Sequence, residues 1–192
     1  ILDFVPDKED MVIACDGGYR HGKKWGIRMD LVVGDFDSLG YLPDHLHVVR
    51  LKPEKDDTDT GYAVKTGLEK GYREFIIYGG IGGRISHTIA NIQLLCGLAE
   101  KGCRGMLIGK DSWYRVICNE EITFDQGHTG FLSAFCMGDM AYGVYEEGLK
   151  YALCDAVLRK EYPIGVSNEF IGKESRVSVR EGTLLLVGEN KE

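Results

Sequence analysis

Residues 31–39 (LVVGDFDSL) decide the fold, because they place two aspartates directly after an apolar run that is typical of a buried strand. Asp35 and Asp37 are so close that their ionised carboxylates repel each other unless they share a cation or a proton. In open α/β sheets, ligand sites lie beyond the carboxyl ends of the strands. Gly34 allows the chain to turn there, and Ser38 can cap the turn or helix that follows. An acidic surface turn is the alternative interpretation of the same residues.

The same order of strand and acid recurs elsewhere in the chain. Residues 11–15 (MVIAC) are apolar and run into Asp16, and residues 47–51 (HVVRL) predict a further strand. If these strands lie side by side in one sheet, the acids that follow them converge at one edge. Asp16 is thus a second acid at the end of a predicted strand.

A dense cluster of charges follows at residues 53–59 (PEKDDTD). Taken alone, this cluster favours a solvated loop and a helix N-terminus, because acids in the first turn of a helix are stabilised by the helix dipole. Thr58 or Asp56 is expected as the N-cap of that helix, which is expected to end near Gly71.

Residues 75–78 (FIIY) predict another strand, which is followed by a glycine-rich turn at residues 79–84 (GGIGGR). Such a turn leaves backbone N–H groups available to bind an anion, and Arg84 adds a planar set of donors for phosphate. The spacing is neither that of a P-loop nor that of G-x-G-x-x-G. A tight turn without a ligand is the alternative.

A helix is predicted from about Ser86, which is expected as its N-cap, to Gly102. His87 and Asn91 lie one turn apart on this helix, so both side chains could face the same cleft. A capping role is the commoner one for a histidine at such a position.

The arrangement of the predicted strands changes along the chain. With residues 105–109 (GMLIG), five short apolar strands alternate with helices or loops, which predicts a mostly parallel α/β sheet. Beyond Ser112 the pattern becomes all-β, with short alternating runs at residues 113–118, 122–124, 131–136, 175–180 and 183–187. We therefore predict an α/β domain at residues 1–111 and a small antiparallel β-sandwich or barrel at residues 112–192.

The composition narrows the choice of partners. The 192 residues include 23 basic and 30 acidic side chains, for a net charge of −7, which argues against nucleic acid or an anionic membrane as the main partner and suits divalent cations. No apolar run approaches the roughly 20 residues of a membrane span. The six cysteines form no C-x-x-C pair, which indicates reduced thiols in a cytoplasmic protein rather than a zinc site.

A series of motifs along nearly the whole chain resembles those of the thiamine pyrophosphokinase family. In order, they are residues 14–18 (ACDGG), 32–38 (VVGDFDS), 55–60 (KDDTDT), 82–92 (GGRISHTIANI), 148–153 (GLKYAL) and 167–172 (SNEFIG). The resemblance implies an α/β catalytic domain, a C-terminal β-sandwich, and a homodimer with active sites between subunits. It also implies transfer of a pyrophosphoryl group from ATP to the hydroxyl of thiamine with Mg²⁺, giving AMP and thiamine diphosphate.

The resemblance also implies roles for individual residues. The metal ligands would be Asp16, Asp35, Asp37, Asp56 and Asp59. The catalytic residues would be Asp35, Asp37, Asp59 and Arg84, and the choice of the aspartate that accepts the hydroxyl proton stays open. The nucleotide would be bound by Lys55, Gly82, Gly83, Arg84, His87 and Asn91.

On the β-rich side, the resemblance implies that Tyr151 stacks on thiamine, because a cationic thiazolium suits an aromatic face. Ser167 and Asn168 would form hydrogen bonds with the aminopyrimidine, which needs both a donor and an acceptor. Without the resemblance, Tyr151 would be interpreted as an ordinary strand aromatic.

The chain departs from the family pattern in two places. Ser86 stands where the family has an acid, and the family's additional N-terminal strand has no counterpart before Pro6. Two alternatives to an active kinase therefore stay open: a catalytically impaired thiamine- or nucleotide-binding protein, and a Mg²⁺-dependent phosphohydrolase that uses residues 35–38 as a nucleophile motif.

Overall fold

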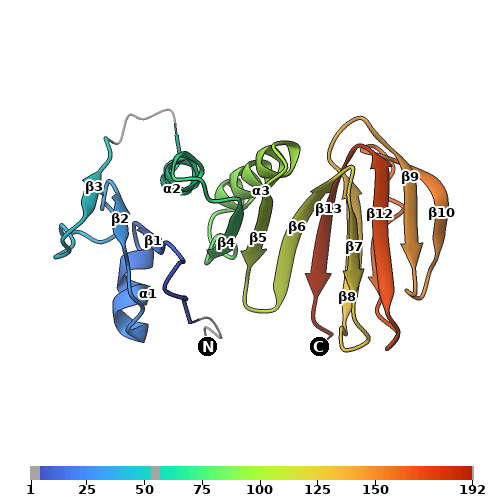
Figure 1. Cartoon of the computed structure of the whole chain (residues 1–192), viewed down its shortest axis with the longest axis horizontal. Coiled ribbons are helices and arrows are strands. Elements are labelled where there is room, and N and C mark those ends of the chain that lie inside the picture. The colour runs from blue at the N-terminus through green and yellow to red at the C-terminus, as the bar shows by residue number, and fades with distance from the viewer. Residues whose placement is uncertain (1–4, 53–56, 192) are drawn as a thin grey trace. The chain divides into compact units, whose positions relative to one another are not determined.

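The computed structural model describes residues 5–52 and 57–191, and the chain divides into two compact units, residues 1–72 and 73–192. Figure 1 shows the elements of each unit. Lys55 and Asp56, for which nucleotide and metal binding are predicted, lie outside the described residues. Together the elements form an α/β plus β-rich fold with few helices. Within the part of the chain that the structure describes, no helix is long and apolar enough to cross a membrane.

The first unit contains a parallel three-stranded sheet with two helices. The strand order is β1-β2-β3, so that β2, which carries the buried Val32 and Val33, lies in the centre. The apolar residues of β2 favour this central place because both faces of a parallel sheet are covered. The elements are β1 (Ile13–Cys15), α1 (Gly18–Trp25), β2 (Leu31–Gly34), β3 (Val48–Arg50) and α2 (Asp59–Glu69).

Local signals set the ends of the helices in this unit. Thr58 is the N-cap of α2, and its Oγ1 accepts a hydrogen bond from the backbone N–H of Gly61 at 3.0 Å. Of the two caps that the sequence allowed, the structure therefore has Thr58. Helix α1 ends at Trp25, and its C-cap, Gly26, has a φ of 65° that glycine adopts without strain.

The second unit combines a helix with two sheets. A six-stranded sheet has the order β11-β8-β13-β6-β5-β4, and a four-stranded sheet has the order β10-β9-β12-β7. Helix α3 contacts β5, β6 and β13 of the larger sheet. The elements are β4 (Glu74–Tyr78), α3 (Ile85–Glu100), β5 (Arg104–Ile108), β6 (Ser112–Cys118), β7 (Glu121–Phe124), β8 (Phe131–Cys136), β9 (Met140–Glu147), β10 (Leu153–Arg159), β11 (Asn168–Glu169), β12 (Ser175–Glu181) and β13 (Thr183–Glu189).

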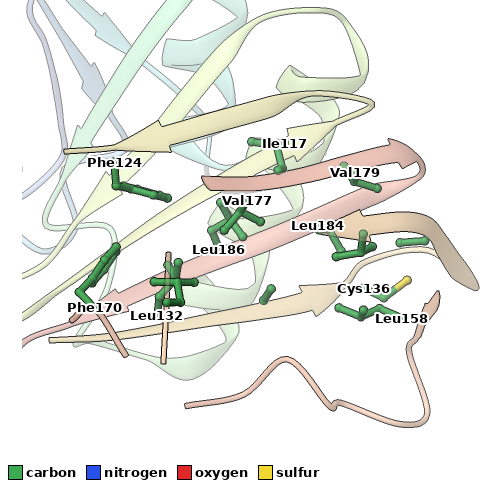
Figure 2. Packing of buried hydrophobic residues seen from close by; sticks show 14 residues of the cluster. Ile117, Phe124, Leu132, Cys136, Leu158, Phe170, Val177, Val179, Leu184 and Leu186 are labelled. Carbon is green, nitrogen blue, oxygen red and sulfur yellow. The ribbon is translucent and has the colours of Figure 1, made fainter. Parts of the chain in front are cut away.

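The main core of this unit lies between its two sheets. Inward-facing residues of β6, β8 and β13 meet those of β9, β10 and β12, as the alternation of apolar and polar residues along these strands requires. Figure 2 shows this packing, with Phe124 and Phe170 at one end of the cluster and Cys136 and Leu158 at the other.

The sheet topology differs from the sequence prediction in one respect. The five N-terminal strands were expected in one mostly parallel sheet, whereas the structure has β1–β3 in one sheet and the parallel pair β4–β5 in another. Strand β5 also pairs antiparallel with β6, through a tight turn in which the N–H of Gly109 donates to the carbonyl oxygen of Ser112 at 2.8 Å. A short turn permits only antiparallel pairing. Strand β5 is therefore parallel to β4 on one side and antiparallel to β6 on the other. The predicted boundary after residue 111 falls in this turn.

Two local predictions were wrong or incomplete. Helix α3 has Arg84 as its N-cap, without a side-chain cap bond, and Ser86 is its second residue rather than its cap. Strands β9, β10 and β11 were not predicted. Strand β9 contains Gly143 and the buried Glu146, and the register of β10 shifts at Ala156, so neither shows regular alternation.

Candidate active site

Three carboxylates meet at the carboxyl ends of β1 and β2. Asp16, Asp35 and Asp37 each provide an oxygen, and these atoms lie within 4.8 Å of one another. Asp16 and Asp35 are partly buried, and Asp37 is exposed. The structure thus brings together the three aspartates that the first two strand ends were predicted to join.

Parallel pairing of β1 with β2 produces this cluster. The backbone N–H of Asp16 donates to the carbonyl oxygen of Val33 at 2.8 Å, which holds the end of β1 against β2. After β2, the buried Phe36 packs into the core of the unit and stands between Asp35 and Asp37. The N–H of Asp37 donates to Oδ1 of Asp35 at 3.2 Å, which keeps the pair together.

Gly34 is required where the two strands come closest. A Cβ at Gly34 would lie 3.2 Å from the Cα and Cβ of Asp16, a separation that is tighter than usual. The absence of a side chain therefore allows Asp16 to approach β2. This close approach, rather than a special backbone angle, explains the glycine before the two aspartates.

The hydrogen bonds of Asp16 are incomplete. Its Oδ2 accepts a hydrogen bond from Oγ of Ser38, so Ser38 supports the cluster instead of capping a helix. Its Oδ1 is buried and has no hydrogen-bond partner among the described residues. A buried carboxylate oxygen without a partner is costly, and a cation would compensate it. Carboxylate oxygens are also the ligands that Mg²⁺ prefers, so the donor set fits this ion.

Asp59, the remaining described aspartate of the predicted set, is not among the three clustered carboxylates. It is the first residue of α2 and partly buried, and its carbonyl oxygen accepts a hydrogen bond from Sγ of Cys15 at 3.6 Å. Cys15 is the residue before Asp16. The N-terminus of α2 is thus tied to the end of β1, and Asp59 lies close in the fold to the clustered acids.

The glycine-rich turn lies in the second unit and leads into α3. Gly82 has a φ of 86°, and Gly82, Gly83 and Arg84 are exposed. Asn91 is buried and donates from Nδ2 to the carbonyl oxygen of Gly80 at 2.7 Å, so it stabilises the turn through a hydrogen bond to the backbone. His87 is exposed, and its Nε2 contacts Nη2 of Arg84. The structure therefore brings the predicted phosphate-binding residues of this turn together.

A second candidate site is the loop of residues 148–151, which we call the Tyr151 loop after its last residue. Tyr151 is 61% exposed. The loop is anchored by Leu149, which forms an antiparallel bridge with Phe170, and both side chains belong to the buried core. Gly148 is required at the start of the loop, because a Cβ there would lie 2.1 Å from the carbonyl oxygen of Glu174.

Asn168 holds the Tyr151 loop through its side-chain amide. Its Oδ1 accepts hydrogen bonds from the backbone N–H groups of Tyr151 and Glu169, both at 2.9 Å. Its Nδ2 donates to the carbonyl oxygen of Tyr151 at 2.6 Å and to Oε2 of Glu146. Both amide hydrogens and both oxygen lone pairs are therefore used within the protein. This differs from the expectation that Asn168 binds the aminopyrimidine directly.

Glu146 is a functional candidate that the sequence prediction missed. It is 2% exposed, and among the described residues it is the only buried carboxylate or basic side chain. Burial raises the pKa of the Glu146 carboxyl to about 7, although the hydrogen bond from Asn168 opposes this rise. A glutamate at an inward-facing position of a strand would have identified Glu146 from the sequence. Strand β9 was not predicted, so its inward-facing positions could not be assigned.

Ser167 lies beside an open hollow on the larger sheet. The hollow has a volume of about 530 Å³ and is lined mainly by apolar and aromatic side chains of β6, β8 and β13, together with Ser133, Ser167 and the acidic Glu189. Ser167 has a φ of 61°, and its N–H donates to Oγ of Ser133 at 3.0 Å. An apolar hollow with a few polar groups suits a small organic ligand.

Both parts of the chain match models of one family. Residues 3–107 match the model described as thiamin pyrophosphokinase, catalytic domain, and residues 119–184 match that described as thiamin pyrophosphokinase, vitamin B1 binding domain. The acidic cluster falls within the first match, and the Tyr151 loop falls within the second.

Known proteins agree with these matches. The chain is 27% identical to the thiamine pyrophosphokinase of Bacillus subtilis (strain 168), over 97% of this chain and 90% of that protein. A crystal structure of thiamine pyrophosphokinase from Bacillus subtilis superposes with a TM-score of 0.87 at 25% identity, and covers 97% of this chain and 91% of its own. That from Geobacillus thermodenitrificans has a TM-score of 0.82 at 24% identity, and covers 99% and 94%. This chain belongs to the thiamin pyrophosphokinase family.

Proposed function

We propose that this chain transfers a pyrophosphoryl group from ATP to the hydroxyl oxygen of thiamine, giving thiamine diphosphate and AMP. Its family makes it an ATP-dependent diphosphotransferase, a thiamine pyrophosphokinase. The observation that carries the assignment of the reaction centre is the meeting of Asp16, Asp35 and Asp37 within the matched catalytic segment. The unpartnered buried oxygen of Asp16 adds support, because it needs a positive partner.

Asp16, Asp35 and Asp37 would hold Mg²⁺, with Asp56 and Asp59 as further candidate ligands. When bound, the ion neutralises the charge of the phosphates and aligns them with the acceptor. Ser38 fixes Asp16, and the N–H of Asp37 fixes Asp35, so the carboxylates are oriented before a ligand arrives. One of the aspartates accepts the proton of the thiamine hydroxyl.

The hydroxyl oxygen of thiamine attacks the β-phosphorus of ATP, and the bond between that phosphorus and the oxygen bridging it to the α-phosphorus breaks. The electron pair of this bond leaves with AMP. Arg84, Lys55 and the backbone of Gly82 and Gly83 would stabilise the charge on the phosphate oxygens. His87 contacts the Arg84 guanidinium and Asn91 supports the turn, so both orient these phosphate-binding groups.

Thiamine would be bound by the aromatic face of Tyr151, which is exposed, and by Ser167 beside the apolar hollow. A cation over an aromatic face contributes about 0.5–2 kcal/mol, which suits the positively charged thiazolium. Asn168 contributes by holding the backbone of Tyr151 rather than by contacting the ligand. The match of this part to the vitamin B1 binding model supports the assignment.

The proposal extends to the organisation of the protein. Residues 1–111 would be the catalytic α/β domain and residues 112–192 the thiamine-binding β-sandwich, which agrees with family matches on either side of that boundary. We also propose a homodimer with active sites between subunits, and a cytoplasmic location. The location is supported by the six cysteines, all described and none in a disulfide. Light scattering of the purified chain would test the dimer.

The test is to incubate the purified chain with thiamine, ATP and Mg²⁺ and to separate the products by chromatography. We expect AMP and thiamine diphosphate in equal amounts, and their loss in Asp37→Asn. Asp111→Asn is the matched control, because Asp111 is exposed and lies outside the acidic cluster. ADP or free phosphate would instead favour a phosphohydrolase, and thiamine binding without turnover would favour a catalytically impaired binding protein.

A further inference from the structure

Glu146 has no part in the chemistry proposed above, yet it is buried at a place where a carboxylate is costly. Removing an ionised carboxylate from water costs several kcal/mol unless hydrogen bonds or charges compensate it. Glu146 has one such bond, from Nδ2 of Asn168 to its Oε2, and its Oε1 has no hydrogen-bond partner among the described residues. An apolar residue at this core position would be expected to stabilise the fold better.

The hydrogen bonds around Asn168 fix which way its amide points. Two backbone N–H groups, those of Tyr151 and Glu169, point to one side of the amide, and only an oxygen accepts from them. The NH₂ group must therefore face the carbonyl oxygen of Tyr151 and the carboxylate of Glu146, both of which are acceptors. Glu146 is the one acidic side chain in this network, and its charge strengthens the bond that it accepts.

We propose that Glu146 is a positioning residue for thiamine binding: through Asn168 it holds the backbone of Tyr151, and so orients the exposed aromatic ring against the substrate. This inference rests on the proposed contact between Tyr151 and thiamine. Asn168 holds Tyr151 at both its N–H and its carbonyl oxygen, so the residue is clamped rather than tethered at one point. Without the Glu146 carboxylate, Asn168 loses the charged acceptor that fixes the position of its amide group.

Other charged groups near the Tyr151 loop have separate partners. On β9 and β12, Glu147 pairs with Arg176. In the loop and on β11, Lys150 pairs with Glu169 at 2.9 Å, and Lys191 also contacts Glu169. The Nζ of Lys150 also lies over the Tyr151 ring, 5.7 Å from its centroid, but it does not contact Glu146. The residues opposite Glu146 in the neighbouring strands β10 and β12 are the apolar Leu153 and Val177. The state of Glu146 is therefore governed by burial and by Asn168.

The direct test of positioning is to measure hydrogen exchange at the Tyr151 backbone amide, a quantity that does not depend on enzyme activity. Glu146→Leu removes the acceptor, and we expect exchange at the Tyr151 amide about tenfold faster than in the parent chain. Glu147→Gln is the matched control, because it is the next residue on the same strand and its side chain is exposed. Unchanged exchange in Glu146→Leu would overturn the inference, whatever the activity of that variant.

Steady-state kinetics provide the functional arm of the test. In Glu146→Leu we expect the KM for thiamine to rise about threefold, no more than in Tyr151→Ala, with kcat and the KM for ATP changed less than about twofold. If kcat falls instead, and the KM for thiamine stays unchanged, the positioning role is overturned. If Tyr151→Ala also leaves the KM for thiamine unchanged, the proposed contact of Tyr151 fails, and this inference fails with it. If the KM for thiamine rises in Tyr151→Ala but not in Glu146→Leu, only the positioning role of Glu146 is overturned.

Glu146→Gln covers the case in which Glu146→Leu does not fold. Its amide oxygen still accepts from Asn168, but the side chain does not titrate. The parent chain should bind thiamine more weakly as the pH falls through about 7, where Glu146 becomes protonated. We expect this weakening to be absent in Glu146→Gln and present in Glu147→Gln. The same pH profile in the parent chain and in Glu146→Gln would overturn the inference.

Discussion

In the acidic cluster, three carboxylates lie within 4.8 Å of one another at the ends of β1 and β2, whereas in the β-rich unit a single carboxyl, that of Glu146, is buried beside the Tyr151 loop. Asp16 and Asp35 are only partly buried and Asp37 is exposed, so an ion or a substrate can compensate their charge. Glu146 is 2% exposed and depends on the fold for compensation. The position of a carboxylate relative to solvent thus separates a ligand-binding role from a positioning role.

The two regions also differ in how the chain builds them. Both regions join residues 22 positions apart in sequence, Ser38 with Asp16 and Asn168 with Glu146. In the cluster these residues follow the ends of the paired strands β1 and β2, with a glycine at the close approach of the strands and aspartates on either side of the buried Phe36. The network around Asn168 instead links β9 to β11, which lie in different sheets. Substitutions in the two regions should therefore have separable effects on chemistry, on thiamine affinity and on stability.

The largest effect is expected for Asp35→Asn, which removes one charge but retains the oxygen that accepts from the N–H of Asp37. We expect kcat/KM to fall on the order of 100-fold or more, because metal-assisted stabilisation of the phosphate charge is lost. The stabilisation that Mg²⁺ and ATP together confer in thermal unfolding should also be lost. Asp111→Asn serves as the control. Full activity in Asp35→Asn would show that the cluster is a surface feature only.

A second prediction concerns the pH dependence of stability. The folded-state pKa of Glu146 is raised from 4.5 to about 7, so between these values the folded chain holds a proton that the unfolded chain has released. The free energy of unfolding contributed by Glu146 therefore falls as the pH rises from about 4.5 to about 7, by roughly 3 kcal/mol, and is constant above and below that range.

Glu146→Gln tests this second prediction, because it removes the titration and leaves the other groups in place. Urea unfolding at about pH 5 and about pH 8 should show a smaller loss of stability with rising pH in the variant than in the parent chain. The variant should also gain stability relative to the parent chain at the higher pH. An identical pH dependence in both chains would contradict the burial of a titrating carboxyl at this position.

A smaller effect is expected for Tyr151→Ala. Loss of the aromatic face should raise the KM for thiamine about threefold to tenfold, in line with the usual strength of a cation over an aromatic ring, and leave the KM for ATP unchanged. Tyr142→Ala is the matched control, because Tyr142 is also exposed and lies on β9. A rise in the KM for ATP as large as that for thiamine would contradict a specific contact with the vitamin.

The smallest effect is expected for Thr58→Ala in the first unit, where the side chain caps α2. Loss of the cap should lower the free energy of unfolding by about 1 kcal/mol, measured by urea unfolding. Thr58→Ser retains the hydroxyl and should lose much less. If both variants lose the same stability, the methyl group of Thr58 rather than its hydroxyl supports the helix.

Much of the acidic cluster was predictable because its signals are local. An apolar run followed by Asp35 and Asp37, and a second run followed by Asp16, predicted strand ends that meet, and the structure has them paired in parallel. The structure added the separate role of Ser38, which supports Asp16. The hydroxyl could not be assigned from sequence, because a turn and a carboxylate 22 residues away compete for the same donor.

The β-rich unit was predicted less completely. Regular alternation identified β6, β8, β12 and β13, but β9 and β10 were missed because a glycine, a buried acid and register shifts interrupt their pattern. Asn168 was predicted to contact the ligand, whereas its amide is used entirely within the protein. Periodicity reports on burial along a strand, and it carries no information about which distant polar groups meet.

The sequence by itself therefore determined the strand ends, the acids that follow them, the glycine-rich turn before α3 and the family to which the motifs point. These features depend on neighbouring residues along the chain, whose spacing sets both local conformation and the side of a strand on which each residue lies. Only the tertiary structure decided that β5 joins β6, and that Glu146 and Asn168 meet beside Tyr151. Such contacts join distant residues, and burial and hydrogen bonding select them only when the whole chain has folded.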